Sequence, residues 1–239
     1  MSADRAGAAV PMVAPSDAHG AASMGAHAGA HLGGPRQQDT AATLGMWVFL
    51  GTEAMFFGPL FLGYGYGRLL HPDGFAAAAR HTDLLLGTCN TAVLLTSSLL
   101  MAVAGLARGS GMARLTARLL WAVATLGMLF LIVKGVEYRH EWQAHLFPAA
   151  GAGFEFADAR YERAARLFFV LYFCMTALHA LHMIIGIAMV TWLALALTRG
   201  AARRASHARV EITALYWHFV DIVWLFLYAL LYLYGRSGA

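Results

Sequence analysis

Charged side chains are scarce in this 239-residue chain, since only 13% of its residues are Asp, Glu, Lys or Arg. A soluble domain carries roughly 25% charged residues, which keep its surface in contact with water. Here 59% of the residues are hydrophobic, and the mean hydropathy is +0.58. This composition excludes an ordinary soluble fold and favours lipid as the solvent of the folded chain.

Cysteine is also scarce, because the chain has only Cys89 and Cys174, and both lie inside apolar runs. A disulfide framework or a thiolate metal site needs more cysteines at closer spacing. We therefore expect both residues to be small buried hydrophobic side chains.

Acidic residues are absent from two of the loops between the apolar runs. Loops 108–118 and 199–209 contain arginines and no acid, whereas in loops 68–83 and 134–166 the two signs balance. Arginine-rich short loops are cytoplasmic, so we expect the N-terminus inside and the C-terminus outside. The isoelectric point near 9.3 therefore reflects membrane orientation, and we expect no nucleic-acid partner.

Residues 1–40 lack aromatic residues and any apolar run long enough for a signal peptide. This segment is rich in Ala, Gly, His, Ser and Pro, which predicts a disordered N-terminal tail before a membrane domain over 41–239. The tail histidines, His19, His27 and His31, are either metal ligands or part of a flexible polar tail, and we expect the latter.

Five apolar segments follow the tail, at 42–69, 84–107, 117–140, 167–198 and 210–234. A helix of about 20 apolar residues crosses a bilayer, and these segments lack the alternation of a barrel strand. The fold class is therefore all-α, a polytopic membrane protein with a bundle of five transmembrane helices. The loop 141–162 is either a cap that contacts a partner or a plain connection.

Glu53 is the most unusual residue of the first span, because a carboxylate near the bilayer centre is costly unless it is paired or neutral. It is either a proton-handling carboxyl or a structural acid bonded to a neighbouring helix. His179 and His182 in the fourth span share a helix face at a spacing of three. Two imidazoles can bind a metal or a haem edge, but nothing nearby completes a ligand set, so we expect structural roles.

The fifth span contains Glu211, Trp217, His218, Asp221 and Trp224 on one polar and aromatic side. Such a stripe is typical of packing against other helices. A His218–Asp221 catalytic pair would need a nucleophile that the sequence does not place beside it, so we expect no catalytic residue and no metal ligand in this chain.

Lys134, Glu137 and Tyr138 end the third span. This is a membrane-interface position, so we expect these side chains to reach lipid headgroups.

Several of these segments resemble the cytochrome c oxidase subunit III family. The resemblance covers about residues 42–235 and follows the short five-helix bacterial form. The matching strings are Phe49–Phe57 (FLGTEAMFF), Asn90–Leu95 (NTAVLL), Glu137–Tyr138, His179–His182 with Ile184–Gly186, and Tyr216–Tyr228 (YWHFVDIVWLFLY). Glu53 stands at the family's carbodiimide-reactive carboxylate, and Glu211 stands at an acid before the last helix.

The resemblance implies a non-catalytic subunit of a bacterial haem-copper terminal oxidase in the inner membrane. Its partners would be subunit I, which is catalytic, and subunit II. These partners would hold the haems and copper, while this chain would have no redox centre and would bind phospholipid. The complex would reduce oxygen to water and translocate protons, and this subunit would support stability and proton uptake.

Three alternatives remain at this point. The same fold accompanies quinol oxidases and nitric oxide reductases, and nothing in these helices distinguishes the electron donor. A small proton channel or transporter would use the intramembrane acids and histidines as a relay, but it predicts inverted repeats that the sequence lacks. A membrane enzyme acting alone would need a nucleophile or a full metal ligand set.

Overall fold

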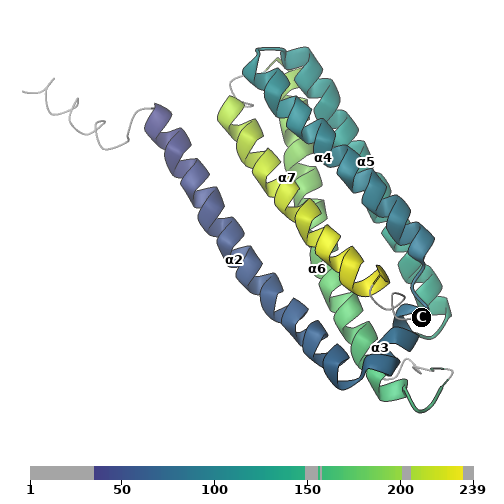
Figure 1. Cartoon of the computed structure of the whole chain (residues 1–239). Helices are drawn as coiled ribbons and strands as arrows, with labels where there is room; N and C mark the ends of the chain where they lie inside the picture. Colours follow the sequence, from purple (N-terminus) through teal and green to yellow (C-terminus); the bar gives the residue numbers. More distant parts are fainter. Residues whose placement is uncertain (1–34, 149–155, 157, 201–205, 234–239) are drawn as a thin grey trace, which may run out of the picture. The chain divides into compact units, whose positions relative to one another are not determined.

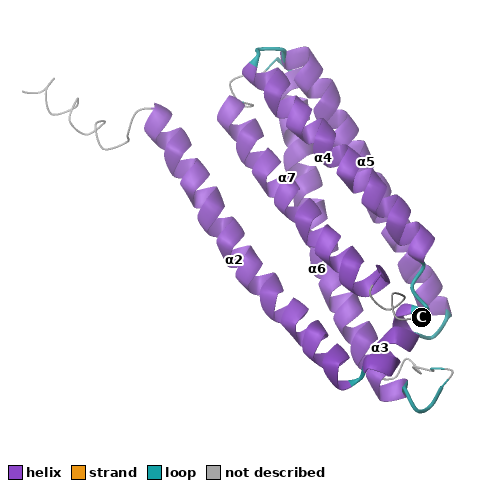
Figure 2. Ribbon diagram, viewed as in Figure 1, coloured by secondary structure: helices purple, strands orange, loops and turns teal. Residues whose placement is uncertain are grey.

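The computed structural model describes residues 35–148, 156, 158–200 and 206–233. The chain forms two units, residues 1–41 and 42–239, and each is considered by itself. The described residues form helices and no strand (Figure 2). In chain order the elements are α2 (Pro35–Leu70), α3 (Pro72–Ala79), α4 (Leu84–Gly109), α5 (Ala113–Gln143), α6 (Glu162–Thr198), α7 (His207–Tyr228) and the π-helix η1 (Ala229–Leu233).

Five helical segments are long and apolar enough to cross a membrane, namely those over 40–70, 84–109, 113–143, 162–198 and 207–233. Each coincides with one of the five predicted spans, and the first four contain theirs completely, which confirms the all-α membrane fold. The helices extend beyond most of the predicted limits because hydropathy marks the part inside lipid, whereas a helix continues into the interface.

The beginning of the first helix differs from the prediction, because α2 starts at Pro35, inside the expected tail. Residues 1–34, with His19, His27 and His31, lie outside the described residues, so disorder there stays a prediction. Residues 149–155 and 157 of the loop 141–162 are also outside them.

The helix α3 was missed by the sequence analysis, which treated residues 68–83 as a loop. Pro72 opens this helix at its first turn, where a missing N–H costs nothing. Its face with Phe75 and Ala78 is fully buried. Gly74 allows the close approach to α6, since a Cβ there would lie 2.5 Å from the Cβ of Ala164. The Pro72 start and the alanine run 76–79 were the available signals.

Helices α4 to α7 lie side by side (Figure 1), with α4 packed on α5 and α7, and α6 packed on α5 and α7. Large aromatic side chains fill the centre, and their polar atoms find partners on α4. The indole nitrogens of Trp217 and Trp224 donate hydrogen bonds to the hydroxyls of Ser97 and Thr91 at 3.2 and 3.1 Å. The aromatic side of the fifth span thus packs inside the bundle.

The π-helix η1 closes one end of the bundle, which we call the α3 end because α3 lies there (Figure 1). It buries Leu231 and Tyr232. The Tyr64 hydroxyl of α2 donates a hydrogen bond to the Leu230 carbonyl at 2.7 Å. The π-helix thereby connects α2 to the end of α7.

The two cysteines correct one expectation, because both are free and exposed on the surface of the bundle. A transmembrane helix buries only one side against its neighbours, so an apolar run does not show which of its residues face outward. Cys89 and Cys174 lie on the outward side.

Gly127 marks the closest approach between α5, α6 and α7. A Cβ at this position would lie 2.8 Å from the Trp217 ring and 3.0 Å from Ile187. We therefore expect Gly127→Ala to lower the thermal midpoint of the purified protein, because an extra methyl in a tight core costs about 1–3 kcal/mol. Gly135→Ala is the matched control on the same helix, since a Cβ there meets nothing within 4 Å. Equal midpoints for the two variants would contradict this packing.

Candidate functional site

Glu53 of α2 and His182 of α6 form an intramembrane pair. Their Oε2 and Nε2 atoms are 3.0 Å apart, and their side chains are 19% and 11% exposed. The Phe57 ring covers the imidazole at a centroid distance of 5.3 Å. The Tyr216 hydroxyl donates a hydrogen bond to the His182 carbonyl at 3.0 Å, which fixes this turn of α6 against α7. The carboxylate of the first span thus has its partner on a neighbouring helix.

The hydrogen bond of the other His182 ring nitrogen, Nδ1, shows which ring atom carries a hydrogen. Nδ1 lies 2.8 Å from the Leu178 carbonyl, which can only accept, so Nδ1 carries a hydrogen. Nε2 then either accepts a hydrogen bond from a protonated Glu53 or donates one to the carboxylate. The pair is therefore neutral overall and shares one proton. Both nitrogens of His182 are engaged within the protein.

His179 lies one turn away on α6 in a very different environment. Its side chain is buried between the rings of Phe130 and Trp224, at centroid distances of 5.5 and 5.2 Å. Neither ring nitrogen has a hydrogen-bond partner among the described residues. Asn90 of α4 donates to the Phe130 carbonyl at 3.4 Å, while its own Oδ1 has no partner. Two helices thus place residues with unsatisfied polar atoms against Phe130, His179 at its ring and Asn90 at its backbone carbonyl.

The strongest polar network is one that the sequence analysis misplaced. Lys134 and Glu137 are only 4% and 2% exposed, so the expectation that they reach lipid headgroups is wrong. Lys134 donates all three of its ammonium hydrogen bonds inside the bundle: to Glu137 at 2.9 Å, to the Tyr172 hydroxyl at 3.0 Å and to the Tyr232 hydroxyl at 2.9 Å. This side of α5 packs against α6 and η1, so the two charged side chains point into the bundle and away from the lipid headgroups.

Tyr172 and Tyr232 complete this Lys134 cluster. Tyr172 donates to Glu137 Oε1 at 2.9 Å, and Tyr232 donates to the same oxygen. The ammonium also lies 5.0 to 5.6 Å from the centroids of four aromatic rings, an arrangement that favours a cation. Burying an ion pair is tolerated when further hydrogen bonds satisfy both ions, and this cluster meets that condition.

Glu141 lies one turn beyond Glu137 and adds a second acid to this end of α5. It is 5% exposed, and neither carboxylate oxygen has a hydrogen-bond partner among the described residues. Sequence reasoning missed Tyr172, Tyr232 and Glu141. The spacing Lys134–Glu137–Glu141 was the only signal, because it puts all three on one side of a helix.

The polar residues of α7 divide between the packed interior and a groove. His218 Nδ1 lies 2.7 Å from the Ser98 hydroxyl. Asp221 is 7% exposed, and both of its carboxylate oxygens lack hydrogen-bond partners in the described part of the chain. His218 is thus bonded to Ser98 and not to Asp221, so the two do not form the pair that a catalytic site would need.

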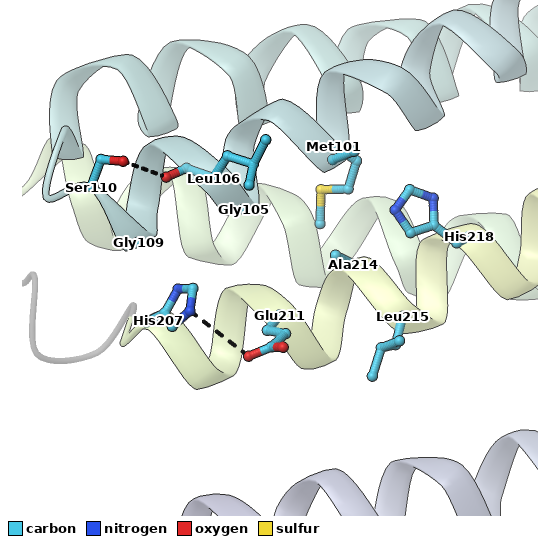
Figure 3. A pocket seen from close by; sticks show the side chains of 11 residues that line it. Met101, Gly105, Leu106, Gly109, Ser110, His207, Glu211, Ala214, Leu215 and His218 are labelled. Carbon is cyan, nitrogen blue, oxygen red and sulfur yellow. Dashed lines mark hydrogen bonds and ion pairs between the residues drawn. The ribbon is translucent and has the colours of Figure 1, made fainter.

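Glu211 and His218 lie on the same side of α7, as their spacing predicts, and line a groove between α4 and α7 (Figure 3). This groove has a volume of about 580 Å³, and its α4 wall includes Gly105 and Ser110. At its mouth His207 Nε2 lies 3.9 Å from Glu211 Oε2, and both side chains are more than half exposed.

No group of three or more His, Cys, Asp or Glu side chains that could hold a metal occurs among the described residues. The fold and these polar groups define a polytopic helical membrane protein in which Glu53 pairs with His182 and Lys134 pairs with Glu137 between apolar helices. The sequence family model described as "Cytochrome c oxidase subunit III" matches residues 22–236. The chain belongs to the cytochrome c oxidase subunit III family.

Individual relatives agree with this family. Cytochrome c oxidase subunit 3 of Thermostichus vulcanus is 28% identical over 194 residues, which are 81% of this chain and 87% of the relative. Quinol oxidase subunit 3 of Bacillus subtilis is 29% identical over 202 residues, which are 82% of this chain and 88% of the relative. Heme-copper oxidase subunit I+III of Aeropyrum pernix is 29% identical over 197 residues, which are 79% of this chain and 22% of the relative. The chain is thus a subunit III of a haem-copper oxidase.

Proposed function

We propose that this chain is a non-catalytic subunit of a bacterial cytochrome c oxidase, in which it supports the stability and proton uptake of the catalytic subunit. The observation that carries the proposal is the Glu53–His182 pair, a neutral intramembrane pair that shares one proton. A proton can move between the two side chains without changing the net charge of the pair, and uptake or release of a proton leaves one charge that stays hydrogen-bonded to the other side chain. It offers proton chemistry and no site for oxygen reduction.

The partners in this proposal are subunits I and II, which hold the haems and copper that supply the redox chemistry. The Aeropyrum pernix relative supports the contact with subunit I, because its name describes subunits I and III in one polypeptide. Both nitrogens of His182 are engaged by protein groups, and the His179 ring is enclosed by aromatic rings. Neither histidine is placed to receive a metal without repacking, which supports the lack of a redox centre here.

The proposal also includes the position of the chain in the cell. Five spans with arginines in alternate loops favour an inner-membrane protein with its N-terminus in the cytoplasm and its C-terminus outside. The outward-facing apolar side chains of these spans would contact phospholipid.

A quinol oxidase is the second candidate complex. The Bacillus subtilis quinol oxidase subunit 3 is as similar to this chain as the Thermostichus vulcanus cytochrome c oxidase subunit 3. Subunit III can therefore keep the same helices with either donor.

Affinity purification of the tagged chain from its native membranes in mild detergent tests the proposal. We expect a large partner chain by mass spectrometry, haem absorbance in the visible spectrum and copper in the same particle. Oxygen consumption with reduced cytochrome c supports the cytochrome oxidase, and consumption with quinol alone supports the second candidate. A purified particle without any haem-containing partner would overturn both.

Glu53→Gln is expected to leave this complex assembled and active, with proton uptake slowed a few-fold at most. The glutamine amide can still donate a hydrogen bond to His182 Nε2, so the contact between α2 and α6 remains. Oxygen consumption and proton uptake by a pH-indicator assay measure the two effects. Glu211→Gln is the control, because this acid is exposed at the groove mouth. Complete loss of oxygen reduction in a normally assembled Glu53→Gln complex would contradict a supporting role.

A further inference from the structure

The buried polar side chains of α6 lie on one face of the helix and on one side of the Glu53 level. We call them the α6 file: His182, His179, Thr176 and Tyr172, which are 9%, 1%, 1% and 0% exposed. Their spacing of three, three and four residues places them one above another. The file runs from the Glu53 pair towards the α3 end and finishes in the Lys134 cluster.

The other direction along α6 is different. From Met183 to Leu197 every buried residue of this helix is apolar or glycine. Polar groups capable of hydrogen bonding therefore connect Glu53 with only one end of the bundle along this helix. This asymmetry is the main observation behind the inference.

Both ends of the file are bonded to groups on other helices. His182 is paired with Glu53 at 3.0 Å. Thr176 lies 2.6 Å from the Tyr138 hydroxyl, and Tyr172 is bonded to Glu137 and Lys134 at 2.9 and 3.0 Å. The hydroxyls of Thr176, Tyr138 and Tyr172 can each donate and accept a hydrogen bond, whereas Lys134 only donates and the Glu137 carboxylate only accepts.

His179 occupies the middle of the file with two unsatisfied nitrogens, and Phe130, which contacts its ring, is also bonded to Asn90, whose Oδ1 is unsatisfied. Buried polar atoms without protein partners are typically satisfied by internal water, with about three hydrogen bonds for each molecule. A neutral imidazole has one donor and one acceptor nitrogen, so it can receive a proton on one side and release it on the other.

The charged and titratable groups named around the file come from α2, α5 and α7. Glu53 faces His182, and the Tyr216 hydroxyl of α7 is bonded to the backbone carbonyl of the same histidine. His179 lies one turn from His182 on its own helix, and Lys134 of α5 lies over the Trp224 ring that also contacts His179. At the α3 end, Glu137 is neutralised by Lys134, whereas the buried Glu141 carboxyl has no such bond and lies near the end of α5.

We propose that the α6 file, with internal water at His179 and Asn90, connects Glu53 to the carboxyl groups of Glu137 and Glu141. Glu53 thereby exchanges its proton with the aqueous phase at the α3 end, and not with the phase at the opposite end. This inference rests on the proposed function, since it assigns the side of the membrane from which protons reach the Glu53–His182 pair. It is a one-sided connection and crosses only part of the membrane.

The sidedness of Glu53 protonation tests this inference in the purified oxidase complex reconstituted in liposomes. A lipid-soluble carbodiimide adds to a protonated carboxyl, and mass spectrometry then quantifies the adduct at Glu53. With the pH set separately on the two sides, we expect labelling to follow the pH at the α3 end. Labelling that follows the other side would overturn the inference. Failure to isolate a haem-containing complex would instead overturn the proposed function, so the two failures are distinguishable.

His179→Phe tests the file itself, because the phenyl ring fills the same space and cannot carry a proton. Time-resolved infrared measurement of the Glu53 carboxyl band, assigned by its loss in Glu53→Gln, follows protonation after a pH jump at the α3 end. We expect at least a tenfold slower response in His179→Phe and recovery in His179→Gln, which keeps a donor and an acceptor. His218→Phe is the control, since it removes a bonded histidine outside the file. A wild-type rate in His179→Phe would overturn the inference, and the sidedness measurement decides it if this variant does not assemble.

Discussion

Lys134→Met is expected to prevent stable folding of this chain. The substitution leaves the buried Glu137 without its counter-ion and removes three hydrogen bonds to Glu137, Tyr172 and Tyr232. Breaking a buried ion pair by removing one partner costs about 3–5 kcal/mol, a large part of the stability of a domain. Thermal unfolding of the detergent-purified chain, followed by circular dichroism, measures the loss.

A second substitution separates the cost of an unpaired Glu137 charge from the cost of the lost hydrogen bonds. Lys134→Met combined with Glu137→Gln removes both charges of the pair, so we expect it to be more stable than Lys134→Met alone. Arg114→Met is the matched control, because this cation is exposed. It should change the free energy of unfolding by no more than about 0.5 kcal/mol. A Lys134→Met protein with the wild-type thermal midpoint would show that the cluster does not hold the bundle together.

Trp224→Ala is expected to have the second largest effect. This indole is 1% exposed and contacts the rings of Phe130 and His179, while its nitrogen donates to Thr91. Its removal opens a cavity between α4, α5, α6 and α7 and leaves a hydroxyl without its donor. Substituting a buried tryptophan with alanine costs about 3–5 kcal/mol, mainly through lost packing contacts.

Trp192→Ala provides the comparison for this prediction. Trp192 lies on α6 with 49% of its surface exposed, so its loss removes a similar side chain without a buried cavity. We expect the thermal midpoint of Trp224→Ala to fall well below that of Trp192→Ala. Equal midpoints would contradict the buried position of Trp224.

Hydropathy alone was sufficient to predict the five spans, because a segment that crosses lipid must be a continuous apolar helix. The face that each helix turns inward was harder to predict. Cys89 and Cys174 lie in apolar runs and yet are exposed, whereas Lys134 and Glu137 lie near a span end and yet are buried. Both errors have the same cause, since burial against a neighbouring helix depends on tertiary packing.

Only some residues of the candidate site were predictable from the sequence, and none of the contacts between them was. Glu53 and His182 each stood out as polar residues in apolar spans, and the structure shows that they pair across 129 positions of sequence. Tyr172 and Tyr232 carried no signal, because a tyrosine in a span is equally typical of the membrane interface. The π-helix that directs Tyr232 into the Lys134 cluster has no pattern in the sequence either.

These contacts explain how a chain with so few charges uses them. Lys134 and Glu137 neutralise each other and bind two tyrosines, Glu53 shares its proton with His182, and His218 is bonded to Ser98. Each arrangement avoids an isolated charge in lipid while keeping a polar link between two helices. The account therefore assigns the intramembrane groups to bracing the bundle and to proton exchange.

Metal analysis of this chain after its separation from the purified complex tests that assignment most directly. The subunit is detached in detergent, recovered as a folded helical protein and examined by visible spectroscopy and elemental analysis for iron and copper. The account predicts that haem and copper stay with the partner chains and that the isolated chain contains neither in stoichiometric amount. Tightly bound iron or copper in the isolated folded chain would contradict it.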